Sequence, residues 1–168
     1  MRSRRSFQPQ VIAKAIGAAI VWIALSTALV AAQSLDGRIF NGMIGPRTNP
    51  DLEDSLHFSD GHFWSDICTR CGFRPGMYIT EPTSEGMRFH GVLESESRGR
   101  FTYDGVVLAD GSIDVSINWE RKRWYWTTKR EIAFQGHEHQ DRTSMTLPEI
   151  LEKMSALDPD GNPMCARF

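Results

Sequence analysis

The chain lacks the short motifs that identify most hydrolases and nucleotide-dependent enzymes. It has no Gly-x-Ser-x-Gly, no His-Glu-x-x-His and no glycine-rich phosphate loop followed by Lys. Its paired carboxylates, such as Glu94 and Glu96, or Asp51, Glu53 and Asp54, fall on stretches that we expect to be exposed or in loops. These absences favour a non-catalytic protein, and the sequence indicates no catalytic residue, metal or cofactor.

Acidic residues are absent from the first 32 positions, where four basic residues occur. An apolar run follows from Ala15 to Ala32 and ends in Val-Ala-Ala. This order is typical of a bacterial export signal. We predict that residues 1–32 are a signal peptide, or an inner-membrane anchor if they are not cleaved. Both outcomes place the remaining chain outside the inner membrane, as a periplasmic or secreted bacterial protein.

The basic head reads Ser-Arg-Arg-Ser-Phe from Ser3 to Phe7. It resembles the twin-arginine export signal at these five positions and departs from it at Gln8. The resemblance implies a domain that folds in the cytoplasm before export. An ordinary Sec signal with a basic head is the alternative.

Basic charge is scarce in the remainder, residues 33–168, which has the length of one domain. The export segment holds four of the 19 basic residues and none of the 21 acidic ones, so the remainder is acidic. Phosphate binding requires a basic face. We therefore expect neither nucleic acid nor an anionic membrane surface as a partner. The sequence leaves the oligomeric state open.

Long helical stripes are missing between Leu35 and Gly136. Apolar and polar residues instead alternate in short runs, most strictly from Ile113 to Trp119, and turn residues separate the runs. We place hairpin turns at 109–111 and at Glu120–Arg123. The strands that we expect are 38–44, 55–58, 62–67, 77–81, 87–94, 101–107, 113–119 and 124–134.

About eight short strands at regular spacing indicate an all-β sandwich or barrel. Short connections favour an antiparallel up-and-down barrel over residues 33–140. Residues 141–168 should form a short C-terminal helix and a tail, because Thr146, Pro148 and Glu149 make a helix start. We interpret Asp158–Gly161 as a turn rather than a calcium loop.

The segment Leu35–Gly42 is similar to the first strand of calycin barrels, the lipocalins and avidins. Tyr103–Val107 and Asn118-Trp119 resemble the glycine- and aromatic-rich strand ends of such barrels. Lipocalins carry a Trp in the first strand, which this chain lacks. The resemblance implies a cup for a small apolar ligand, with Arg130 in the place of an Arg that packs over that Trp.

Aromatic residues supply the candidate ligand site. They either fill the barrel or surround a small, partly apolar ligand. An inward Arg among them either binds a ligand carboxylate or stacks on a Trp ring. A ligand-binding barrel is our main hypothesis, and a structural or interaction subunit with a solid barrel is an alternative. Strand alternation gives these ligand-binding candidates: Phe89, Phe101, Tyr103, Trp119, Trp124, Trp126 and Arg130.

Cysteine is scarce, with three residues in the chain. Cys68-Thr69-Arg70-Cys71 fits a redox dithiol, half of a metal site or a structural disulfide. An oxidising compartment favours a disulfide, which would join Cys68 to Cys71 or either of them to Cys165. A further hypothesis is a metal or redox protein that adds His137 and His139, although their polar surroundings favour a solvated loop.

Overall fold

The structure is a computed structural model and describes residues 34–141 and 143–167. The predicted export segment lies outside these residues, and Gln33–Phe168 form one compact unit. No helix in the described ranges is long and apolar enough to cross a bilayer. The elements are β1 Ile39–Gly45, β2 Leu52–Ser59, β3 His62–Ser65, α1 Asp66–Arg70, β4 Gly76–Pro82, β5 Gly86–Ser95, β6 Gly99–Leu108, β7 Ser112–Lys122, β8 Thr127–Glu138, α2 Leu147–Ser155 and the 3-10 turn η1 Pro163–Arg167.

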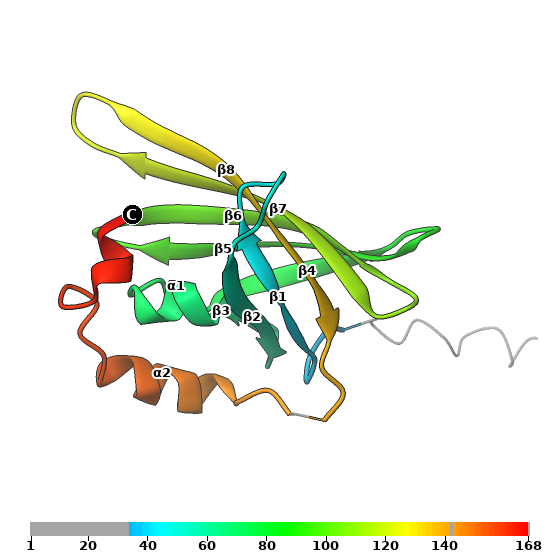
Figure 1. Cartoon of the computed structure of the whole chain (residues 1–168). Helices are drawn as coiled ribbons and strands as arrows, with labels where there is room; N and C mark the ends of the chain where they lie inside the picture. The colour runs from blue at the N-terminus through cyan, green and yellow to red at the C-terminus, as the bar shows by residue number, and fades with distance from the viewer. Residues whose placement is uncertain (1–33, 142, 168) are drawn as a thin grey trace, which may run out of the picture. The chain divides into compact units, whose positions relative to one another are not determined.

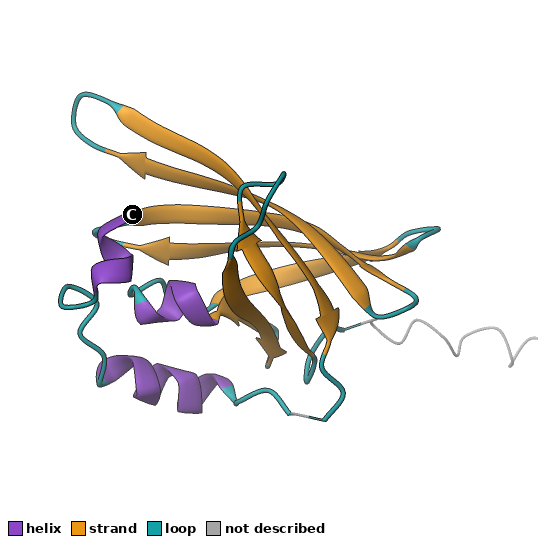
Figure 2. Cartoon of the chain, in the orientation of Figure 1, coloured by secondary structure: helices purple, strands orange, loops and turns teal. Residues whose placement is uncertain are grey.

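The eight strands close into an antiparallel barrel in which each strand pairs with the next along the chain (Figures 1 and 2). Pairing of β1 with β8, from Phe40 opposite Glu138 to Gly45 opposite Ala133, completes the ring. The predicted all-β, up-and-down barrel with a short C-terminal helix is therefore confirmed.

Alternation along the strands separates the core from the surface. On β7, Ile113, Val115, Ile117 and Trp119 are buried, and the residues between them are exposed. Burying one face of each strand is the main favourable term in folding such a sheet. The predicted turn at 109–111 is also confirmed, because Gly111 has a φ of 82° and its N–H donates to the Leu108 carbonyl.

The helix α1 replaces the end of a predicted strand. The strand expected over residues 62–67 ends at Ser65, and the chain then turns into a five-residue helix. The Ser65 Oγ accepts from the Cys68 N–H at 3.1 Å, and Asp54 Oδ1 on β2 accepts from the Ile67 N–H at 3.0 Å. These acceptors satisfy N–H groups that a helix start leaves unpaired, which explains why so short a helix forms.

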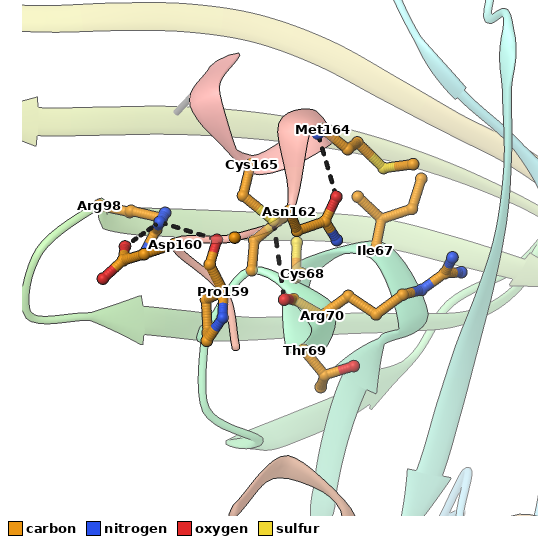
Figure 3. The surroundings of a disulfide bond; sticks show 12 residues. Ile67, Cys68, Thr69, Arg70, Arg98, Pro159, Asp160, Asn162, Met164 and Cys165 are labelled. Carbon is orange, nitrogen blue, oxygen red and sulfur yellow. Dashed lines mark hydrogen bonds and ion pairs between the residues drawn. A yellow bond between two sulfur atoms is a disulfide. The ribbon is translucent and has the colours of Figure 1, made fainter. Parts of the chain in front are cut away.

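The C-terminal segment begins with the capping box expected at Thr146, whose N–H donates to Glu149 Oε2 at 2.7 Å. The N–H groups of Asp160 and Gly161 both donate to Asp158 Oδ1, so the predicted turn is confirmed. A disulfide then joins Cys165 on η1 to Cys71 at the end of α1, across 94 residues of sequence (Figure 3). The tail is thereby tied to one end of the barrel.

We predict that Cys165→Ser lowers the free energy of unfolding by about 2–4 kcal/mol, because the disulfide closes a long loop in the unfolded chain. Urea unfolding of residues 33–168 measures this change. Cys68→Ser is the matched control, since it removes a thiol and leaves the disulfide in place. Equal stability of Cys165→Ser and the parent chain would contradict the prediction.

Candidate functional site

Four of the seven predicted ligand-binding residues lie together inside the barrel. The side chains of Phe89, Phe101, Tyr103 and Trp119 all point inward and are at most 4% exposed. Their rings contact one another or Phe63 of β3, with centroids 5.1 Å apart for Phe63 and Tyr103 and 6.3 Å apart for Phe101 and Trp119. Such spacing is that of packed aromatic pairs, so side chains fill this part of the interior.

Two inward-facing glycines make room for these rings. A methyl group added at Gly91 would collide with the Phe63 ring, and one added at Gly105 would collide with the Phe89 ring. The rings therefore occupy the space that a side chain at these positions would take. The sequence allowed rings that fill the barrel or rings that surround a ligand, and the packing around Phe63 and Phe89 corresponds to the first. Ligand binding in the interior stays a prediction, and it requires these rings to move.

Arg130 lies at the rim of the barrel. It is exposed, so the expectation of an Arg among the interior rings is wrong. Its guanidinium carbon lies 5.4 Å from the ring centroid of Trp119, its partner residue on β7. The Trp119 indole N–H donates to the Arg98 carbonyl at 3.0 Å. The arrangement is that of an Arg stacked on a structural Trp, which is the second of the two roles expected for it.

Trp124 and Trp126 do not join the interior cluster. The strand predicted to begin at Trp124 begins at Thr127, and the predicted tip at 120–123 lies mostly within β7. The turn is instead closed by the Arg123 N–H, which donates to the Trp126 carbonyl at 2.8 Å. The expected place of both Trp residues in the interior is therefore wrong, because they lie in the turn at the end of the hairpin. Trp124 is 93% exposed, Tyr125 66% and Trp126 45%.

The three aromatic rings at this turn pack against each other. Trp124 and Tyr125 have centroids 5.2 Å apart at an interplanar angle of 88°, and Tyr125 and Trp126 are 4.1 Å apart at 85°. Arg123 lies 5.7 Å above the Trp126 ring. We name residues 123–126 the aromatic tip. It is a compact group of perpendicular rings with a cation beside it.

The three cysteines form one disulfide and leave one free thiol. Of the pairings left open by the sequence, the structure has Cys71–Cys165, and Cys68 is free and buried (Figure 3). The Cys68 Sγ lies 3.3 Å from the Tyr103 hydroxyl, and burial raises the pKa of this thiol to about 12. Because the thiolate is the reactive form, Cys68 is held in its unreactive state at neutral pH.

A buried carboxylate organises the polar groups beneath α1. Asp54 is 5% exposed, accepts from the Ser65 hydroxyl at 2.6 Å and from the Ile67 N–H at 3.0 Å. Burial raises its pKa to about 6, although the two hydrogen bonds act in the opposite direction. The expectation that Asp54 lies on an exposed stretch is therefore wrong. Its place between alternating apolar residues on β2 was the available signal.

The histidines do not gather into a cluster. His137 pairs across from Asn41 on β1, and the Asp141 N–H donates to His139 Nδ1 at 3.4 Å. Within the described ranges no three His, Cys, Asp or Glu side chains lie close enough together to hold a metal ion. His57, which the sequence did not single out, is buried and stacks on Trp64 at 5.4 Å.

An open groove of about 720 Å³ lies outside the barrel, beside β4, β5 and the turn between β5 and β6. Within it, Arg98 pairs with Asp160 at 2.6 Å and Arg100 pairs with Glu94 at 3.2 Å. Of the three cations that line the groove, Arg74, Arg98 and Arg100, the last two form these ion pairs within the chain, so the groove is a weaker candidate for binding than the aromatic tip.

Comparison with protein-family models, curated proteins and solved structures gives no match to this chain. The candidate site is therefore defined by geometry alone.

We predict that Asp54→Asn changes how stability depends on pH. The folded pKa of Asp54 is about 6 against an ordinary value of 3.8. The folded state therefore binds the proton more tightly, and this group stabilises the fold as pH falls from about 6 towards 3.8. The free energy of unfolding of the variant minus that of the parent should be about 2 kcal/mol higher at pH ~7.5 than at pH ~4.5. Urea unfolding at both pH values measures it, and a pH-independent difference would contradict the raised pKa.

Proposed function

We propose that the chain is an exported, non-catalytic contact module, in which a solid barrel holds the aromatic tip out for a partner. The single observation that carries this proposal is the contrast between two sets of aromatic rings. Those inside the barrel are packed and buried, whereas Trp124, Tyr125 and Trp126 are adjacent in sequence and exposed together. Exposed aromatic groups of this kind are typical of interaction surfaces.

The hairpin that bears the tip is held firmly. β7 and β8 pair without a break from Ser112 opposite His137 to Lys122 opposite Thr127. Near the tip, Glu120 pairs with Lys129 at 3.2 Å and with Lys122 at 3.8 Å. Trp and Tyr side chains have only two rotatable χ angles, so a rigid hairpin that carries them loses little conformational entropy when it binds a partner. This favours a contact role.

The buried ionisable groups support a non-catalytic role. Asp54 binds the start of α1, and Cys68 is a protonated thiol against Tyr103. Each has a structural partner and is closed off from solvent. Export and a calycin-like origin remain part of this proposal, on the strength of the N-terminal pattern and the up-and-down barrel.

We predict that residues 33–168, purified from a periplasm, give a native mass spectrum without a bound ligand and lighter than the reduced chain by two hydrogens. A neutral fluorescent probe such as N-phenyl-1-naphthylamine should show no saturable uptake if the packed rings stay in place. An adduct of a few hundred daltons, or saturable uptake that Tyr103→Ala changes and Trp124→Ser does not, would contradict the proposal and restore the ligand cup.

A further inference from the structure

The charges of the chain are strongly segregated around the aromatic tip. The segment 120–131 contains five basic residues and two acidic ones, whereas the rest of residues 33–168 contains ten basic residues and nineteen acidic ones. The net charge of residues 33–168 is therefore negative although the hairpin segment 120–131 is itself positively charged. This local positive charge indicates an anionic partner, because a binding partner responds to the potential near the surface that it approaches rather than to the net charge of the protein.

The hairpin also extends beyond the barrel wall (Figure 1). β1 pairs with β8 only over Ala133–Glu138, whereas β7 pairs with β8 from Thr127 onward. Residues 127–132 of β8 therefore lie beyond the stretch that pairs with β1. On its other side the hairpin stays paired with β6 as far as Glu120, so it passes β6 by two residues of β7, about 7 Å at ~3.3 Å per residue. Charge is screened over about 10 Å at 0.1 M salt, so acidic residues at the opposite end of the barrel contribute little to the field at the tip.

The chemistry of the tip indicates which anionic partner fits. Trp and Tyr favour the boundary between lipid headgroups and acyl chains, where Lys and Arg contact phosphates. The rings of Trp124, Tyr125 and Trp126 lie at 85–88° to their neighbours, so they form a wedge rather than the flat platform on which sugars or bases stack. A wedge flanked by cations is suited to shallow insertion.

From these observations we propose that the aromatic tip binds the interface of an anionic phospholipid bilayer. Trp124 and Tyr125, the most exposed of the three, enter the headgroup boundary. Arg123 contacts lipid phosphates, and Lys122 does so in exchange for its 3.8 Å contact with Glu120. The inference rests on the proposed contact function and names its partner. It reverses the expectation from overall charge that an anionic membrane is excluded, because that expectation averaged the hairpin with the barrel.

The test is cosedimentation of residues 33–168, the unit that holds the described core, with phospholipid vesicles. Phosphatidylcholine vesicles are compared with vesicles that contain phosphatidylglycerol as well. The domain should bind the anionic vesicles at least about tenfold more tightly, and higher salt should weaken this binding. Trp fluorescence should shift to the blue on binding, because Trp124 leaves water.

Variants locate the binding on the tip. The double variant Trp124→Ser/Trp126→Ser should lose about tenfold or more in affinity for anionic vesicles. Met77→Ser/Ile79→Ser, at two exposed apolar positions on β4, is the matched control and should bind normally. Lys122→Glu/Arg123→Glu should also lose binding. Arg47→Glu/Arg88→Glu makes the same charge change at the other end of the barrel, where Arg47 contacts Asp114 at the start of β7, and should bind more strongly than the tip variant. Circular dichroism and urea unfolding establish that each variant is folded.

Absence of binding to both vesicle types overturns the lipid proposal, as does equal binding to both or normal binding by the folded tip variant. A tip that binds an acidic protein and no vesicle overturns it as well. None of these results affects the contact function, which fails instead if the native domain carries a small ligand in its interior. The two failures are therefore distinguishable.

Discussion

An eight-stranded barrel encloses only enough space for its own side chains or for one small ligand, and this constraint governs the rest of the structure. Here the space is taken by aromatic rings from β2, β3, β5, β6 and β7, with Gly91 and Gly105 leaving room for Phe63 and Phe89. Because the rings interlock across the interior, they fix how the strands meet. The contact site that we propose therefore lies on the outer surface, where the β7–β8 hairpin carries the exposed rings.

One end of this barrel needs extra support. There the chain passes from β3 through α1 to β4, and β3 and β4 pair at only two positions, His62 with Met77 and Phe63 with Gly76. Asp54 binds the start of α1, and the disulfide at Cys71 ties its end to the tail. The hydrogen bonds that Asp54 accepts and a long-range disulfide thus hold a stretch in which strand pairing is short.

Local patterns predicted the barrel, because alternation on strands such as β7 and the capping box at Thr146 are encoded by neighbouring residues. The helix α1 depends on Asp54, which is distant in sequence, so local propensity could not reveal it. The pairing of Cys71 with Cys165 likewise depends on where the fold brings the tail. For the site, alternation placed Phe89 and Tyr103 correctly but failed at Trp124, because aromatic residues favour strands and masked the turn.

The most direct test of the account is an NMR titration of residues 33–168 with anionic lipid bicelles, read at the indole N–H groups of Trp64, Trp119, Trp124 and Trp126. The barrel buries the first two and the hairpin exposes the last two. The account predicts that the signals of Trp124 and Trp126 shift and broaden while those of Trp64 and Trp119 stay fixed. Shifts at Trp119 and Trp64 with an unchanged Trp124 signal would mean that the interior takes up lipid, and would contradict a solid barrel with an external contact site.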